Sequence, residues 1–214
     1  MANGCVQVFA CILASVGLVC LITSTCVNEW KTYGYSNEGI VKSLKEYVGL
    51  WMECTVHGPR QLECTVYDTL DSVLYQRGEV QWTRAMMILS IILSVCGLAV
   101  AMLGMKCTLC LDADKQVKNK VALGGGILLI LSGVCALGIV SWYANDVITN
   151  FHNPKPEEKR YSLGRCLFVG WGGALLSLIG GALLACCSLS RSTSRRSYTS
   201  SPPQLPMTSD KEYV

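Results

Sequence analysis

The chain has 214 residues, of which 51% are hydrophobic and 15% are charged, and its formal net charge at pH 7 is +3. Ordinary soluble domains carry about 25% charged residues, so this composition disfavours a soluble domain and favours a membrane protein. We expect neither a nucleic-acid partner nor a small-molecule substrate.

Four windows are free of charged residues and long enough for a helix to cross about 30 Å of hydrocarbon, which takes roughly 20 residues. They are residues 5–27, 85–105, 121–144 and 166–187. The first is longer than the apolar part of a secretory signal, about 7 to 15 residues, and no basic segment precedes it, so we expect a retained helix. Pumps and ion-coupled transporters need ionisable groups at depth, so a transporter is disfavoured.

Basic residues near the window ends orient the chain, because Lys and Arg favour the cytosolic side. They are Lys106, Lys115, Lys118 and Lys120 between the second and third windows, and Arg191, Arg195 and Arg196 after the fourth. Both termini are therefore expected in the cytosol. The prediction gives cytosolic segments 1–4, 106–120 and 188–214, membrane helices 5–27, 84–105, 121–144 and 165–187, and extracellular segments 28–83 and 145–164.

Small residues recur at helical spacing in the first and fourth windows and predict close helix packing in lipid. They are Ala10, Ala14, Gly17, Gly173, Ser177 and Gly181. We interpret them as contacts inside a left-handed four-helix bundle; a dimer face is the alternative.

The extracellular segment 28–83 is too long for a loop without structure of its own. Four of its runs are rich in aromatic and β-branched residues: 30–35, 39–44, 47–56 and 62–67. Turn formers at 36–37 and 57–59 separate them, which predicts an antiparallel meander. Residues 68–76 have a weak helical spacing, and in the second extracellular segment a turn around 151–156 is followed by a candidate strand at 159–163.

Two of the thirteen cysteines, Cys54 and Cys64, lie well inside an extracellular segment, which is an oxidising environment. They flank a turn between two predicted strands, so we predict a disulfide, with two free thiols as the alternative. Its main effect would be on strand register, since a one-residue slip turns every side chain to the opposite face.

Four more cysteines follow the second and fourth helices at their cytosolic ends and are candidates for S-palmitoylation. They are Cys107, Cys110, Cys186 and Cys187. Free thiols or half a zinc site are the alternatives, although a structural zinc takes four ligands and no cytosolic histidine is present. We expect no metal and no cofactor, and His57 and His152 are interpreted as surface residues.

The segment after the last helix is rich in Ser and Thr and then in Pro, which predicts a disordered tail. It ends in Tyr213-Val214. A free carboxylate behind an apolar last residue is the form that PDZ domains bind by strand addition, so we predict a PDZ-binding end.

Several residues together resemble the claudins, the strand-forming proteins of tight junctions. They are Trp30, the run Gly49-Leu50-Trp51, Cys54, Cys64 and Arg84, with Phe151 and the terminal Tyr213-Val214. Peripheral myelin proteins and calcium-channel gamma subunits share the tryptophan and cysteine pattern, but the terminal residues and the short second extracellular segment favour claudins.

The resemblance implies a membrane α+β fold, with a five-stranded antiparallel extracellular sheet on the helix bundle. Such proteins polymerise side by side in one membrane and head to head between cells. Leu70 takes the place of the side chain that inserts into a neighbour's pocket formed by Phe151, His152 and Leu163. Position 152 is often aromatic in the family, so His152 is a departure.

The resemblance also implies that charges on the sheet set ion preference in a narrow pore. Acidic residues outnumber basic ones in segment 28–83, and the candidates are Glu53, Glu63, Asp68 and the neutral Thr65. We therefore expect a weak cation preference.

The expected function is a structural, non-enzymatic one: a paracellular barrier or charge-selective pore at tight junctions of the plasma membrane. The expected partners are further copies, other claudins and PDZ scaffold proteins of the zonula occludens type. An auxiliary subunit that modulates a channel or receptor is the alternative.

Overall fold

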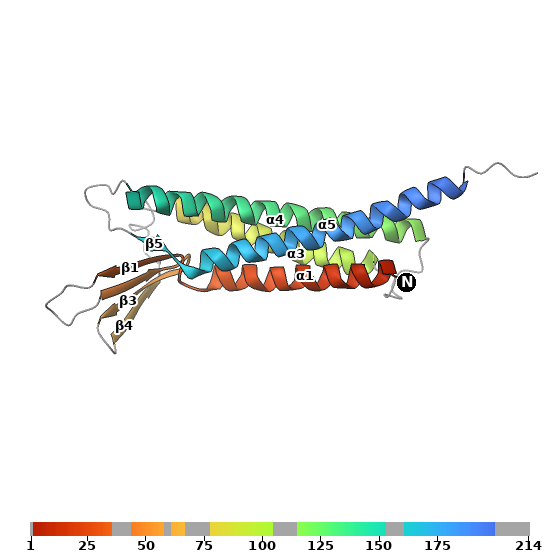
Figure 1. Ribbon diagram of the computed structural model, residues 1–214. Coiled ribbons are helices and arrows are strands. Elements are labelled where there is room, and N and C mark those ends of the chain that lie inside the picture. Colours follow the sequence, from red (N-terminus) through yellow and green to blue (C-terminus); the bar gives the residue numbers. More distant parts are fainter. Residues whose placement is uncertain are drawn as a thin grey trace, which may run out of the picture.

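The computed structural model describes residues 2–35, 44–57, 61–66, 78–104, 115–152 and 161–199. Its elements are α1 (Ala2–Cys26), β1 (Lys31–Tyr35), β2 (Leu44–Val48), β3 (Met52–His57), β4 (Gln61–Val66), α3 (Gly78–Gly104), α4 (Lys115–His152), β5 (Ser162–Leu163) and α5 (Arg165–Thr199). Among these residues, all four helices are long and apolar enough to cross a membrane. They lie side by side, and the sheet stands at the end of the bundle away from the N-terminus (Figure 1). The predicted bundle with a small antiparallel sheet is confirmed.

The sheet has the strand order β4-β3-β2-β1-β5, and every pairing is antiparallel. Strands β1 to β4 follow one another along the chain, as the predicted meander requires. The fifth strand comes from the segment between α4 and α5 and pairs with β1, where Leu163 lies opposite Lys31. The strand predicted at 159–163 is thus present at Ser162–Leu163; residues 159 and 160 lie outside the described part.

The strand limits predicted in the first segment are partly wrong. The run 47–56 is not one strand, because Gly49-Leu50-Trp51 forms the turn between β2 and β3, where the Gly49 N–H donates to the Met52 carbonyl at 3.0 Å. The described part of the second strand is Leu44–Val48, and residues 39–43 of the strand predicted at 39–44 lie outside the described residues. His57 ends β3 instead of opening a turn. Residues 68–76, the predicted short helix, lie outside the described residues. At Gly49-Leu50-Trp51 the aromatic composition predicted a strand, but contacts of this turn with the helices decide its local structure.

The helices are longer than the apolar windows. Helix α3 begins at Gly78 and α4 runs from Lys115 to His152, so parts of the predicted segments 28–83, 106–120 and 145–164 are helical. Phe151 and His152 therefore lie on a helix, and the turn predicted to include them is wrong at these two residues. Extending a formed helix costs far less than starting one, so a helix continues past the residues that hydropathy marks.

Helix α5 continues to Thr199, so the disorder predicted from residue 188 is wrong for 188–199. The first part of this extension still packs against α4: Ser188 is buried, and Asn119 Nδ2 donates to its carbonyl at 2.6 Å. Residues 200–214 lie outside the described part of the chain.

Small residues stand where the helices cross. A Cβ on Gly17 of α1 would lie 2.7 Å from Ser177 Oγ of α5, and a Cβ on Gly125 of α4 would lie 2.6 Å from the Ala101 nitrogen of α3. Such approaches leave no room for a larger side chain. The small residues therefore make contacts within the bundle, as the first interpretation predicted.

Candidate functional site

Trp30 attaches the start of β1 to two helices. Its side chain is fully buried, its Nε1 donates to the Ser24 carbonyl of α1 at 2.8 Å, and its ring meets the Tyr143 ring of α4 edge-on at 5.1 Å. A buried indole N–H needs a partner, and here helix α1 supplies it. The sheet is thereby fixed at its base.

The turn between β2 and β3 makes the second attachment. Leu50 is fully buried, and Trp51 Nε1 donates to the Thr25 carbonyl of α1 at 2.9 Å. Arg84 of α3 donates to the Leu50 carbonyl and lies over the Trp51 ring, 5.0 Å from its centroid. A Cβ on Gly49 would lie 2.5 Å from the Asn28 Cα, so only glycine fits there. We call Trp30, Gly49-Leu50-Trp51 and Arg84 the sheet–bundle joint.

Gly164 completes the base of the sheet, and the sequence interpretation missed it. Its N–H donates to the Trp30 carbonyl at 2.9 Å, and a Cβ here would collide with the backbone carbonyl of Glu29. A glycine between a short strand and a helix was the available signal, but many such glycines serve only as turns.

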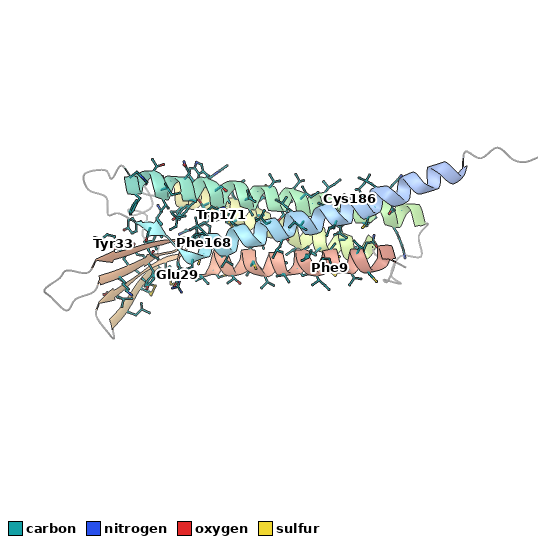
Figure 2. All side chains as sticks on the ribbon, in the orientation of Figure 1. Phe9, Glu29, Tyr33, Phe168, Trp171 and Cys186 are labelled. Atoms are coloured by element: carbon teal, nitrogen blue, oxygen red, sulfur yellow. A yellow bond between two sulfur atoms is a disulfide. The ribbon has the colours of Figure 1, made fainter. Side chains whose placement is uncertain are left out.

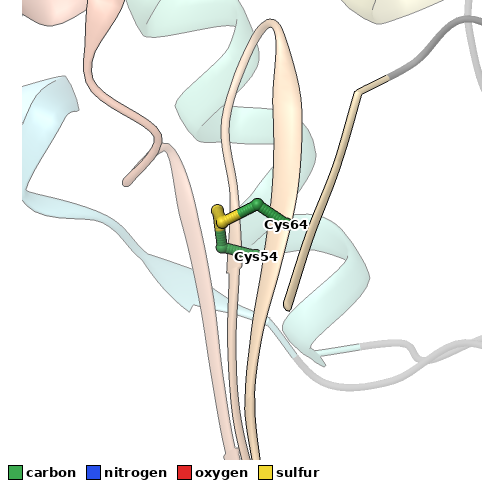
Figure 3. Close-up of a disulfide and its surroundings, with 2 residues drawn as sticks. All are labelled: Cys54 and Cys64. Carbon is green, nitrogen blue, oxygen red and sulfur yellow. A yellow bond between two sulfur atoms is a disulfide. The ribbon is translucent and has the colours of Figure 1, made fainter. Parts of the chain in front are cut away.

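Cys54 on β3 and Cys64 on β4 are opposite each other in the strand register and form a disulfide (Figure 3). The predicted bond is confirmed. It joins β4, one of the two edge strands among the described residues, to β3.

The acidic side chains lie on the face of the sheet opposite the disulfide. Side chains alternate between faces along a strand, and directly paired residues share a face. Glu53 pairs with Thr65 and Thr55 with Glu63, whereas Cys54 pairs with Cys64. The candidates Glu53, Glu63 and Thr65 therefore share one face. Asp68 lies outside the described residues.

Glu46 belongs to the same face and was not among the predicted candidates. It pairs with Thr55, is only 4% exposed, and accepts a hydrogen bond from Tyr161 Oη at 3.1 Å. Residue 46 fell between the strands predicted at 39–44 and 47–56, so the face of Glu46 could not be read from alternation. We call the side that carries Glu46, Glu53 and Glu63 the acidic face.

The predicted assembly residues lie near the C-terminal end of α4, on the side of the bundle where the sheet stands (Figure 1). Phe151 and His152 are exposed on its last turn, with their ring centroids 6.1 Å apart. Leu163 is half-buried on β5 and packs against the core, and β5 contacts α4. Leu70 lies outside the described residues.

Two of the predicted palmitoylation sites are described. Cys186 is exposed and Cys187 is half-buried, both on the part of α5 remote from the sheet, where Figure 2 labels Cys186. Cys107, Cys110, Tyr213 and Val214 lie outside the described part. Within the described residues, no group of three or more His, Cys, Asp or Glu side chains could hold a metal ion.

Comparison with known proteins identifies the family. Residues 4–184 match the PMP-22/EMP/MP20/Claudin family. Claudin-7-A of Danio rerio and claudin-1 of Rattus norvegicus are each 39% identical to this chain over the whole of both chains. Claudin-19 of Mus musculus is 39% identical over 87% of this chain and 82% of its own length. These relatives do not favour the alternative of an auxiliary subunit. The chain belongs to the PMP-22/EMP/MP20/Claudin family and is a claudin of the tight junction.

Proposed function

We propose that this protein polymerises with itself and with other claudins, in one membrane and across the gap between two cells, and forms a paracellular path lined by its acidic face. The sheet stands outside the cell and both termini lie in the cytosol. The role is structural and involves no catalysis. The observation that carries the proposal is the shared face of Glu53 and Glu63, opposite the disulfide.

The proposed selectivity is a weak preference for cations. Carboxylates along a narrow aqueous path attract cations and repel anions, and they act most strongly where the surrounding protein limits the screening water. The joint holds the sheet by buried contacts, so the carboxylates have a fixed place from which to act.

Dilution potentials across an epithelial layer that expresses the protein test this role. Glu53→Gln with Glu63→Gln is expected to shift the potential towards anion preference, while transepithelial resistance stays measurable. Lys45→Gln is the matched control, because Lys45 pairs with Val56 and so lies on the opposite face. An equal shift in the control, or none in the double variant, would contradict the acidic face as the lining.

Side-by-side assembly is proposed to use Leu70 of one copy and the surface around Phe151, His152 and Leu163 of the next. The exposure of Phe151 supports this part of the proposal, since an aromatic side chain outside a membrane is a common anchor of protein interfaces.

The cytosolic side is proposed to carry two further sites. Tyr213-Val214 has the form that PDZ scaffold proteins of the zonula occludens type bind. Cys186 and Cys187, together with Cys107 and Cys110, are proposed sites of S-palmitoylation; the exposure of Cys186 on α5 supports access of a lipid-transferring enzyme.

A further inference from the structure

One ion pair connects the sheet to the outer part of α4. Lys31 opens β1, and its Nζ lies 3.4 Å from Oδ2 of Asp146 on α4. Only 17% of the lysine side chain and 21% of the aspartate side chain are exposed. Charges that are largely withdrawn from water attract each other more strongly and are less screened by salt than exposed charges.

Each partner of the pair makes a further contact. Asn150, one turn along α4, places its Nδ2 at 3.4 and 3.5 Å from the two carboxylate oxygens of Asp146. The Lys31 ammonium also lies 4.9 Å from the centroid of the Tyr143 ring, a cation–π contact. The pair is therefore embedded in a packed contact, unlike a pair of mobile surface charges, which contributes little.

The position of Lys31 in the register relates the pair to the acidic face. Lys31 lies opposite Val48, and Val48 lies opposite Glu53, so all three residues share one face of the sheet. The joint attaches the turn after β2 to α1 and α3 through Thr25 and Arg84. The ion pair attaches β1 to a different helix, α4. It adds to the contact between the Trp30 ring and the Tyr143 ring of the same helix.

We propose that Lys31 and Asp146 form a clamp that sets the angle between the sheet and α4, and with it the direction of the acidic face. Both are positioning residues. The consequence for ion preference rests on the proposed function, because the angle matters there only if the acidic face lines the path.

The test combines a structural and a functional measurement on the full chain. Lys31→Met keeps the aliphatic stem and removes the charge, and Asp146→Asn serves the same purpose if that variant fails to reach the membrane. The swapped pair, Lys31→Asp with Asp146→Lys, restores opposite charges. Lys45→Met, with the same charge loss on the other face of the sheet, is the matched control. Amide hydrogen exchange of the purified protein reports on β1 and β5, and dilution potentials report on ion preference.

The single variants are expected to speed exchange in β1 and β5 at least about fivefold, the factor that corresponds to ~1 kcal/mol of local opening. They are also expected to shift the dilution potential, and the swapped pair should return both readouts towards the native values. Unchanged exchange in the single variants overturns the clamp, as does a swapped pair that exchanges as fast as they do. Faster exchange with an unchanged dilution potential supports the clamp and contradicts the acidic face as the lining of the path.

Discussion

At the scale of the residue, Gly49 shows how little space the joint leaves. A Cβ here would meet the Asn28 backbone and side chain at 2.5 Å, and the backbone cannot move away without displacing Leu50 from the core. The requirement for glycine is therefore steric and local. Gly34, on β1, offers a direct comparison, because no atom of the described residues other than its chain neighbours lies within 4 Å of the same added carbon.

Gly49→Ala is expected to lower the free energy of unfolding by about 1–3 kcal/mol, the usual cost of forcing an extra methyl into a packed site. Gly34→Ala is expected to change it by no more than about 0.5 kcal/mol, because the added methyl reaches open space. Thermal unfolding of the two purified variants, followed by tryptophan fluorescence, provides the measurement. Equal melting temperatures for the two variants would refute the steric account.

At the scale of the element, two serines hold α3 against α4 inside the membrane. Ser90 Oγ donates to the Ser132 carbonyl at 2.9 Å, Ser132 Oγ donates to the Ser90 carbonyl at 2.7 Å, and both residues are fully buried. Polar groups inside lipid have few other partners, so a reciprocal pair of this kind fixes the register between the two helices.

Ser90→Ala and Ser132→Ala are each expected to cost about 0.6–2 kcal/mol of stability. The double variant should cost less than the sum of the two, because the two hydroxyl oxygens also contact each other at 3.1 Å and either single variant already removes that contact. A double-mutant cycle from thermal unfolding in one detergent measures this coupling. Ser15→Ala serves as control, since Ser15 Oγ donates to the Cys11 carbonyl within its own helix. Strictly additive costs would mean that the two hydroxyls act independently.

At the scale of the whole molecule, the proposed side-by-side assembly uses the exposed ring of Phe151. Phe151 is 45% exposed and lies beyond the apolar window of α4. Figure 2 labels another exposed aromatic residue, Phe168, near the start of α5. The centroid of its ring lies 5.6 Å from that of Trp171 in the same helix. Phe168 is therefore a matched control for Phe151, because it is exposed but belongs to the predicted membrane helix.

Phe151→Ala is expected to reduce strands in freeze-fracture images of transfected cells that otherwise lack them, while surface delivery continues. Phe168→Ala should leave the strands in place, because that ring belongs to the predicted membrane helix. Surface biotinylation controls for delivery. Normal strands in the Phe151 variant would remove this side chain from the proposed assembly surface.

The sequence predicted the features that depend on a single dominant property of the residues or their environment. Hydropathy found the four helices because a membrane demands about 20 apolar residues, and the oxidising environment outside the cell singled out Cys54 and Cys64. It did not predict the turn at Gly49-Leu50-Trp51 or the burial of Glu46. Both depend on contacts between segments far apart in the chain, such as Arg84 with Leu50 and Tyr161 with Glu46, which no local pattern records.

The tryptophans of the joint also complete helix α1. A helix leaves its last four carbonyls without partners, and an unpaired carbonyl close to lipid is costly. Here the Val27 N–H bonds the Thr23 carbonyl, and the indole N–H groups of Trp30 and Trp51 bond the next two, Ser24 and Thr25. The two indoles thus act as a C-terminal cap supplied from the sheet. Phenylalanine has no N–H with which to make these bonds, so the end of the first membrane helix depends on two side chains from the base of the sheet.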